Sequence, residues 1–183
     1  MRTRTVCLAA TVLLGLASVI RAADEVKEGQ PAPDFTLQAT HASEIAPGKK
    51  DGDRVSLKDV KDKNIVLFFY PKAMTRGCTV ESCGFRDRIK KFEDLDTVVI
   101  GISCDKLEDQ QKFTEKENLN FPLLADPDKK VTEAFGALNP ERGLPSRYTY
   151  VIDKKGVVRK VYKTVTPARH PDEVLDYIKE NLK

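Results

Sequence analysis

Two cysteines in the middle of the chain have a spacing and a setting that suit thiol redox chemistry. Both lie in the stretch Pro71–Cys83, which directly follows the apolar run Ile65–Tyr70. The run predicts a buried strand, and a helical pattern follows it, so Cys78 falls in the first turn of a helix. The unpaired N–H groups and positive dipole end of a helix favour a thiolate, the reactive form of cysteine. With Arg76 adding positive charge two residues earlier, we expect a nucleophilic thiol at Cys78.

The second cysteine, Cys83, lies five residues after Cys78. In an ideal α-helix such a pair has Cα atoms roughly 8–9 Å apart, whereas a disulfide rarely spans more than about 7 Å. The two sulfurs therefore cannot bond while the helix is intact, and a disulfide requires the first turn to unwind. Gly84, a poor helix former, would ease that opening. The alternatives are two buried core cysteines or a static structural clip.

A family resemblance becomes specific at this stretch. The pattern of Pro71, Thr75 and Cys78 resembles the peroxiredoxin active-site signature. The segment Gly77–Asp87 is similar to the Q-type, or bacterioferritin-comigratory, branch of that family. Further matching segments cover nearly the whole chain after the first 22 residues: Ala32–Leu37, Gly101–Ser103, Arg147–Asp153 and His170–Leu175.

The resemblance implies a thiol-dependent peroxidase that reduces hydrogen peroxide and organic hydroperoxides. Cys78 would be the peroxidatic nucleophile, and Cys83 would resolve its sulfenic acid as an intramolecular disulfide. Thr75 would direct its hydroxyl at the thiolate and the peroxide, and Pro71 would shield the nucleophile from water. Arg147 would supply positive charge to the thiolate and the polarised peroxide.

The resemblance also implies that the backbone N–H groups of Gly77 and Cys78 assist in binding the peroxide. No metal, haem or flavin is required. The implied reductant is a thioredoxin-like protein, and Q-type relatives are often monomeric. This chain departs from the family pattern at Ala73, Met74 and Arg76, positions that would affect reductant docking and substrate preference rather than the chemistry.

Several of these residues have other interpretations. Thr75 could be a helix N-cap, and Arg147 a solvated strand residue. Glu81 could orient Arg147 or be an exposed acid in the first turn. His170 is expected to start the last helix, and Cys104 to be a half-buried small residue after a strand.

Two other function classes compete with the peroxidase. An exported thioredoxin-like thiol-disulfide oxidoreductase typically has two residues between its cysteines, whereas this chain has four, although Pro145 before Arg147 favours this alternative slightly. A copper-delivery protein with a thioredoxin fold typically has three residues between its cysteines and a distant histidine, and this chain has only two histidines.

The elements that must position Cys78 form an α/β pattern. The apolar runs Ile65–Tyr70 and Val98–Ile102 predict buried strands, and Phe85, Ile89 and Phe92 predict a helix of about 15 residues between them. Such a βαβ unit makes the two strands parallel. We also expect a polar helix over Leu107–Asn118.

The remaining expected elements are listed here: short N-terminal strands at Asp34–Leu37 and Arg54–Leu57, a strand at Phe121–Leu124, a short helix at Lys130–Phe135, a hairpin of Tyr148–Ile152 with Val157–Tyr162, and a last helix with Pro171 at its first position. This order predicts one central mixed sheet with helices on both faces, preceded by short extension strands. It is the arrangement of a thioredoxin-like three-layer α/β sandwich.

The first 22 residues predict a secretory signal peptide, followed by a single domain over residues 23–183. Arg2 and Arg4 precede an apolar run of about 15 residues, Val6–Ile20, and small residues follow. The run is short for a transmembrane helix, which needs about 20 residues. Cleavage after Ala22 would release an exported, periplasmic or secreted, protein, while an uncleaved anchor is the alternative.

Composition and charge limit the partners. The chain has 183 residues, enough for one domain, and 32% of them are charged. The predicted cleavage removes three of the 31 basic side chains, which leaves them equal in number to the 28 acidic ones. A neutral chain gives no basic face for nucleic acid and no attraction to a membrane surface. Three cysteines remain, and this odd number argues against a purely structural disulfide framework.

Overall fold

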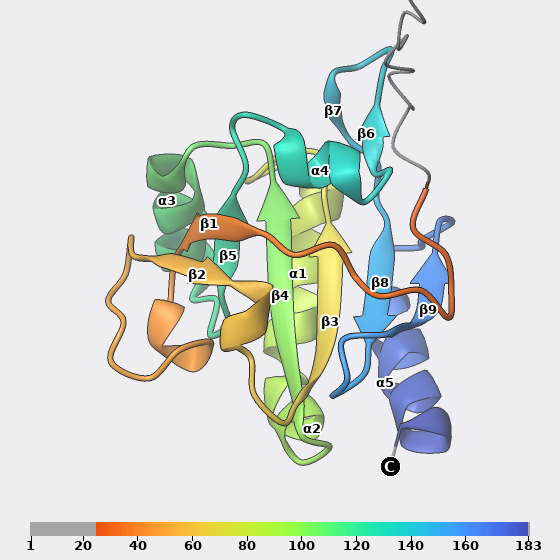
Figure 1. Ribbon diagram of the computed structural model, residues 1–183. Coiled ribbons are helices and arrows are strands. Elements are labelled where there is room, and N and C mark those ends of the chain that lie inside the picture. Colours follow the sequence, from red (N-terminus) through yellow and green to blue (C-terminus); the bar gives the residue numbers. More distant parts are fainter. Residues whose placement is uncertain (1–24, 183) are drawn as a thin grey trace, which may run out of the picture.

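A central mixed sheet of seven strands organises the molecule (Figure 1). In this computed structural model, residues 25–182 are described. The strand order is β2-β1-β5-β4-β3-β8-β9. The strands are β1 (Thr36–Ala39), β2 (Arg54–Ser56), β3 (Asn64–Phe69), β4 (Thr97–Ser103), β5 (Leu123–Ala125), β8 (Thr149–Ile152) and β9 (Val158–Tyr162). The signal peptide predicted for residues 1–22 lies outside the described residues.

Two strand pairings are parallel and the others are antiparallel. β3 pairs in parallel with β4, with Leu67 opposite Ile100, and β4 pairs in parallel with β5. On its other side, β3 pairs antiparallel with β8, with Leu67 opposite Tyr150. The predicted βαβ unit and the predicted C-terminal hairpin, β8 with β9, are therefore confirmed.

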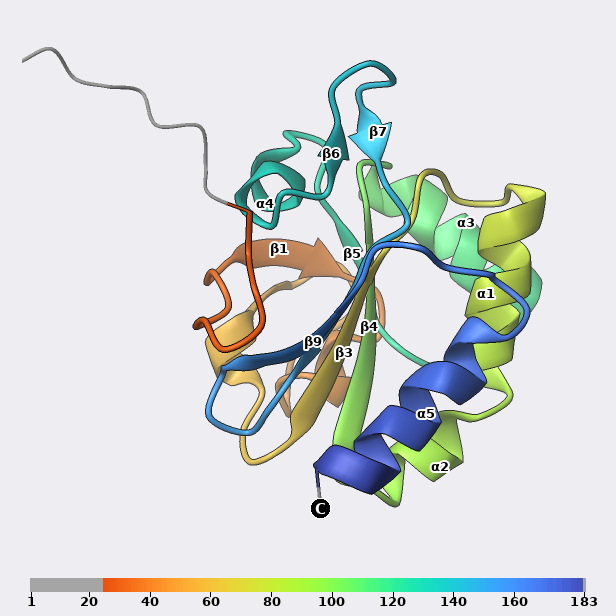
Figure 2. The ribbon, with the colours of Figure 1, turned by 90° about the vertical axis from the view of Figure 1, so that its right-hand side faces the viewer.

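Helices cover both faces of the sheet. The helices are α1 (Arg76–Arg86), α2 (Ile89–Glu93), α3 (Leu107–Glu117), α4 (Lys130–Ala134) and α5 (His170–Asn181), with short 3₁₀ turns at Ala42–Glu44 and Leu57–Asp59. Figure 2 shows α1, α2, α3 and α5 on one side of β3 and β4, and α4 on the other. The predicted thioredoxin-like sandwich is confirmed.

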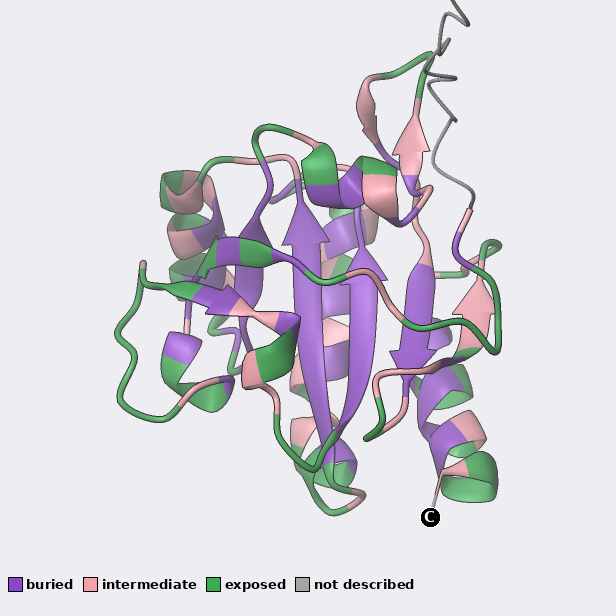
Figure 3. Ribbon diagram, viewed as in Figure 1, coloured by how far each residue is buried: buried purple, intermediate pink, exposed green. Residues whose placement is uncertain are grey.

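The sheet has one apolar core on each of its faces, because successive side chains along a strand point to opposite faces. In β3 every residue is buried, so each face of the strand needs its own apolar partners (Figure 3). Val66, Phe68 and the next residue, Tyr70, pack under α1, α3 and α5. Ile65, Leu67 and Phe69 pack on the opposite face in the core that includes residues of α4.

The helix predicted around Phe85, Ile89 and Phe92 is two helices rather than one. α1 ends at Arg86, and α2 begins at Ile89. At the break, the Arg88 side chain donates to the Gly84 carbonyl at 3.0 Å, and the Arg88 N–H donates to Phe85 instead. The Arg88 N–H thus bonds to the residue three positions back rather than four, and the regular α-helical pattern ends there. Phe85 and Phe92 are nevertheless both fully buried, as the pattern predicted.

Other differences are local. α5 begins at His170, so Pro171 is its second residue rather than its first. The first strand begins at Thr36, two residues later than expected. A small two-stranded sheet, β6 (Leu138–Asn139) with β7 (Leu144–Pro145), was not predicted, because strands of two residues show no periodicity.

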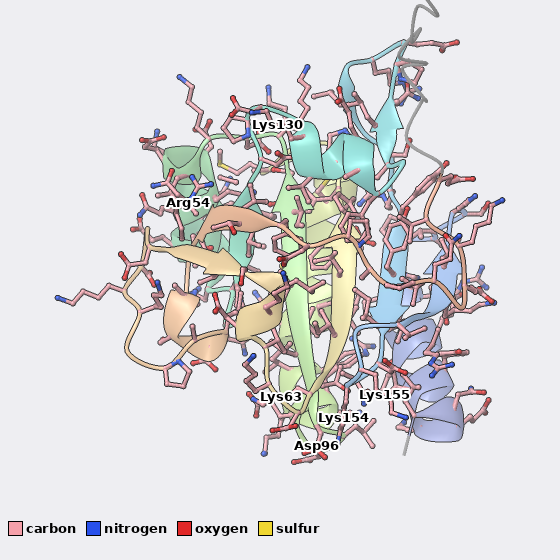
Figure 4. The ribbon with its side chains drawn as sticks, viewed as in Figure 1. Arg54, Lys63, Asp96, Lys130, Lys154 and Lys155 are labelled. Carbon is pink, nitrogen blue, oxygen red and sulfur yellow. The ribbon has the colours of Figure 1, made fainter. Side chains whose placement is uncertain are left out.

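The two ends of the central strands carry different chemistry. β3 and β4 both end on the side where α1 begins (Figure 1). The opposite end carries Lys63, Asp96, Lys154 and Lys155, which are grouped there in Figure 4. Lys154 Nζ lies 2.9 Å from Asp96 Oδ2 and ties the β8–β9 turn to the start of β4. Cys78, the third residue of α1, lies at the other end of these strands, away from this charged group.

Candidate active site

Cys78 lies at the start of α1, close to the end of β3. It is the third residue of the helix, and it is fully buried. The Thr79 N–H donates to the Thr75 carbonyl at 2.8 Å. The N–H groups of Gly77 and Cys78 come earlier in the first turn, where a helix has no internal acceptors for them. The sulfur thus sits at the positive end of the helix, as the sequence predicted.

Arg147 brings a positive charge to this sulfur from a distant part of the chain. Its Nη2 lies 3.3 Å from Cys78 Sγ, and its side chain is only 18% exposed. It precedes β8, which pairs with β3 and so brings Arg147 beside the start of α1. The alternative of a solvated strand residue does not fit, since Arg147 precedes the strand and most of its side chain is enclosed beside the cysteine.

Glu81 holds the other side of the guanidinium. Its Oε2 accepts a hydrogen bond from Arg147 Nη1 at 2.5 Å, and the residue is fully buried. Burial raises the pKa of Glu81 to about 7, and the Arg147 guanidinium limits this rise. Of the two interpretations of Glu81, the orienting contact with Arg147 is thus the one that the geometry supports.

Thr75, Gly77 and Pro71 surround the start of α1. Thr75 is the N-cap residue, but its hydroxyl donates to the Lys72 carbonyl at 2.9 Å rather than capping the helix. A Cβ added at Gly77 would lie 3.2 Å from Arg147 Nη2, so glycine allows the guanidinium to approach the helix. Pro71 lies two residues after the end of β3 and lines a hollow of about 570 Å³ together with Arg147.

Cys83 lies on the same helix but faces a different neighbour. Cys78 and Cys83 are both free thiols, and α1 is unbroken between them. The Cys83 thiol is half-buried and donates to Glu117 Oε2 on α3 at 3.8 Å. Burial raises the pKa of this thiol, and the Glu117 carboxylate adds to the rise, opposed by Arg86. The two cysteines are thus held apart in the folded helix.

The C-terminal half of α1 is anchored to α5, which the sequence did not reveal. A Cβ added at Gly84 would lie 2.9 Å from Pro171 Cγ, so only glycine fits this contact. The Phe85 ring meets the His170 ring edge-on at 6.0 Å. Just beyond the end of α1, Arg88 Nη2 donates to Asp172 at 2.7 Å. The anchored end of α1 is the end that carries Gly84, not the end that carries Cys78.

His170 and Cys104 have the places expected for them. His170 starts α5 and is fully buried, with Nε2 2.8 Å from Thr149 Oγ1. Burial lowers the pKa of His170 to about 4, with a further contribution from Arg147. Cys104 follows β4 and is half-buried, 3.6 Å from Thr132 Oγ1.

One polar cluster beside the site was missed by sequence reasoning. Asp105, after β4, accepts the Ala73 N–H at 2.7 Å. Ser103 Oγ donates to the same carboxylate oxygen at 2.7 Å. The only sequence signal was Ser103 in a segment that matched the family, which says nothing of contact with residue 73. Pairing of β3 with β4 places these groups side by side.

Membrane-spanning helices and metal-binding clusters are both absent from the described part of the chain. Over residues 25–182, no helix is both long and apolar enough to cross a membrane. In the same part of the chain, no group of three or more His, Cys, Asp or Glu side chains is arranged to hold a metal ion. The chemistry described above rests on Cys78 and its immediate neighbours.

Comparisons with known proteins agree with this geometry. The AhpC/TSA family matches residues 28–161. Peroxiredoxin Bcp of Bacillus subtilis is 40% identical over 161 residues, covering 85% of this chain and 96% of that protein. Chloroplastic peroxiredoxin Q of Suaeda salsa is 40% identical over 156 residues, covering 84% of this chain and 68% of that protein.

A solved structure extends the likeness to the fold. The crystal structure of peroxidoxin BcpB from Mycobacterium tuberculosis superposes with a TM-score of 0.76 at 33% identity. The match covers 87% of this chain and all of that one. With the buried cysteine at a helix start, its arginine partner and these matches in place, the chain belongs to the AhpC/TSA family, in the Bcp and peroxiredoxin Q group of peroxiredoxins.

Proposed function

We propose that Cys78 is the peroxidatic nucleophile of this thiol-dependent peroxidase. The observation that carries the proposal is the 3.3 Å approach of Arg147 Nη2 to Cys78 Sγ at the start of α1. Both the guanidinium and the helix terminus favour the thiolate over the thiol. The same charges stabilise the negative charge that develops on the peroxide during attack.

In the first step, the Cys78 thiolate attacks one oxygen of the peroxide, and the O–O bond breaks. The leaving alkoxide or hydroxide takes up a proton and departs as an alcohol or as water, while Cys78 becomes a sulfenic acid. Arg147 stabilises the charge on the departing oxygen, and the N–H groups of Gly77 and Cys78 bind the peroxide. Thr75 orients the attacked oxygen, and Pro71 keeps bulk water from the sulfur.

In the second step, Cys83 resolves the sulfenic acid. Its sulfur bonds to Cys78 Sγ, and the hydroxyl of the sulfenic acid leaves as water with the proton of the Cys83 thiol. An intact helix of this length keeps the two residues too far apart for a disulfide. The step therefore requires the first turn of α1 to unwind.

The third step returns the disulfide to two thiols at the expense of an external dithiol. We propose a thioredoxin-like protein as the reductant, and hydrogen peroxide and organic hydroperoxides as substrates. We also propose that the signal peptide predicted at residues 1–22 directs the enzyme to the periplasm or the exterior, where the reductant would be an exported protein. We further propose that the enzyme acts as a monomer and binds neither nucleic acid nor membrane.

The decisive experiment measures peroxide consumption with dithiothreitol as the reductant, for wild type and for Cys78→Ser. Cys104→Ser serves as the control, because it also removes one thiol, in this case a half-buried one outside the site. We expect loss of turnover only in Cys78→Ser, with an unchanged circular dichroism spectrum. Turnover near the wild-type rate in Cys78→Ser would show that this cysteine is not the nucleophile.

A further inference from the structure

The loop of residues 70–75 joins β3 to α1, and we refer to it as the active-site loop. A polar cluster that contacts this loop has no part in the three reaction steps. It consists of Tyr70, Ser103, Asp105 and Gln110, and we refer to it as the Asp105 cluster. Tyr70 follows β3, Ser103 ends β4, Asp105 follows β4 and Gln110 lies on α3. All of these except the half-buried Asp105 are fully buried. Buried polar groups of this kind are held in place by their hydrogen bonds.

The hydrogen bonds of the cluster fix the Asp105 carboxylate from behind. Ser103 Oγ donates to Asp105 Oδ2 at 2.7 Å, and Gln110 Nε2 donates to Ser103 Oγ at 2.8 Å. Gln110 also accepts a hydrogen bond from the Tyr70 hydroxyl. Burial raises the pKa of Tyr70 far above its usual range, so this hydroxyl stays a donor. A chain of hydrogen bonds thus leads from the end of β3, through α3, to Asp105.

Asp105 is the member of the cluster that bonds to the active-site loop. Asp105 Oδ2 accepts the Ala73 N–H at 2.7 Å, next to a residue in an unfavourable backbone conformation. That residue, Met74, has φ of 60°, in the left-handed region that non-glycine residues seldom adopt. Such a conformation persists only where surrounding contacts impose it. The Ala73–Asp105 bond is one of these contacts.

The loop conformation in turn places Thr75. The Thr75 hydroxyl donates to the Lys72 carbonyl at 2.9 Å, which leaves its oxygen free to accept a hydrogen bond. Lys72 and Thr75 flank Ala73 and Met74, so their relative position depends on the backbone between them. If the Ala73 N–H lost its acceptor, the left-handed residue could relax, and the Thr75 hydroxyl would lose its bond to the Lys72 carbonyl and its fixed position before Cys78.

We propose that Asp105 is a positioning residue for the first oxidation step. By holding the Ala73 N–H, it keeps Thr75 in the orientation that attack by Cys78 requires. The inference rests on the proposed function, because it assigns Asp105 to the step that Cys78 carries out. Small displacements of an orienting group reduce reaction rates strongly, since attack requires a defined geometry.

The proposal predicts that loss of Asp105 affects the two chemical steps differently. The first step needs the ordered loop, so it should slow when Asp105 is removed. The second step requires the start of α1 to unwind, and it gains nothing from an ordered loop. Formation of the Cys78–Cys83 disulfide should therefore keep its rate or become faster in the same variant.

The experiment compares Asp105→Ala, Asp105→Asn and the control Asp109→Ala in the full chain. Asp109 lies a short distance along the chain, in the first turn of α3, and has no contact with the loop among the described residues. Rapid mixing with hydrogen peroxide, acid quench and intact mass separate the sulfenic acid from the disulfide. We expect the rate constant of the first step to fall roughly tenfold to a hundredfold in Asp105→Ala. Asp105→Asn keeps an oxygen that accepts the Ala73 N–H, so it should retain most of the rate.

A second readout follows the hydrogen bond itself. Exchange of the Ala73 N–H with deuterated solvent, measured by NMR, should accelerate in Asp105→Ala but not in Asp109→Ala. If the alanine variant does not fold, Ser103→Ala replaces it, because it removes the bond that orients Asp105. We expect intermediate slowing of the first step in that variant.

Three results would overturn the proposal: a wild-type first step in Asp105→Ala or Ser103→Ala, an Asn variant as slow as the Ala variant, or equal slowing of both steps. These results leave the proposed function intact. A wild-type protein that forms no sulfenic acid at Cys78 would contradict the proposed function instead.

Discussion

Gly84 on α1 lies directly against Pro171 on α5, so closely that a Cβ at residue 84 would be 2.9 Å from Pro171 Cγ. Real Cβ atoms do not approach other atoms to this distance without displacement. The contact joins the helix of the two cysteines to the last helix of the chain (Figure 2). It therefore decides which end of α1 is free to open.

Gly84→Ala should lower the free energy of unfolding although alanine is the better helix former. The gain in helix propensity is about 1 kcal/mol, while overpacking costs about 1–3 kcal/mol. Urea denaturation measures the difference. Pro171→Ala removes the clashing Cγ, so in that background Gly84→Ala should no longer destabilise the protein. A stabilising effect of Gly84→Ala in the wild type would show that the helices separate easily here.

Oxidation should open the first turn of α1 and leave its second half closed. Gly84 and Phe85 pack this second half against α5, and Arg88, two residues after its end, bonds to Asp172, whereas Cys78 precedes these contacts. After peroxide treatment, we expect a Cys78–Cys83 disulfide in peptide maps and faster hydrogen exchange at residues 77–83. The N–H of Phe92 should stay protected. A dominant bond to Cys104, or a bond between two chains, would assign the second cysteine differently.

Arg147→Ala should slow the first oxidation step by roughly 10²–10³. The guanidinium lies 3.3 Å from the Cys78 sulfur, and within residues 25–182 no other basic side chain bonds to that sulfur. Rapid-quench oxidation by hydrogen peroxide measures the rate constant. Arg54→Ala is the control, since Arg54 is an exposed arginine on β2, at the far edge of the sheet. An unchanged rate in Arg147→Ala would remove this residue from the mechanism.

Glu117→Gln should make the Cys83 thiol more acidic and more reactive near neutral pH. Burial raises the pKa of Cys83, and the Glu117 carboxylate 3.8 Å away adds to this rise. The neutral amide removes only the second contribution. Alkylation by iodoacetamide as a function of pH, in a Cys78→Ser, Cys104→Ser background, measures the change. Glu115→Gln, an exposed site on the same helix, should leave the profile unchanged.

His170 should make the protein less stable as the pH falls. Its pKa is lowered to about 4, first by burial and then by Arg147. The Glu173 carboxylate, 3.7 Å from Nδ1, favours the proton but is 46% exposed, so burial prevails. Because the folded state disfavours the protonated form, this stabilisation is complete above pH 6.5 and is lost as the pH falls toward 4.

The expected loss is on the order of 3 kcal/mol, from about 1.4 kcal/mol for each pH unit between the two pKa values. Urea denaturation between pH 7 and pH 4 measures it. The chain has only two histidines, so NMR titration can compare His170 directly with His41. A His170 midpoint near 6.5 would contradict the burial argument.

The sequence alone determined the parts of this protein that depend on residues close together in the chain. An apolar run of the right length predicts a buried strand, and β3 and β4 are found where such runs occur. The apolar run followed by a helical pattern predicted that Cys78 lies at a helix start, as it does. The five-residue separation of Cys78 and Cys83 also predicted that they are not bonded in the folded helix, and both are free thiols.

Only the tertiary structure decided which distant groups meet at Cys78. Glu81 and Arg147 are brought together by the pairing of β3 with β8, and nothing local shows that Glu81 is fully buried. The bond from Asp105 to Ala73 requires β3 and β4 to end side by side. Likewise, the Arg88 side chain at the break between α1 and α2 bonds to the Gly84 carbonyl and to Asp172 on α5, and the second partner comes from a distant part of the chain. Periodicity in the sequence reports which face of an element is apolar, whereas burial, pKa and hydrogen-bond partners depend on elements that pack against that face from elsewhere in the chain.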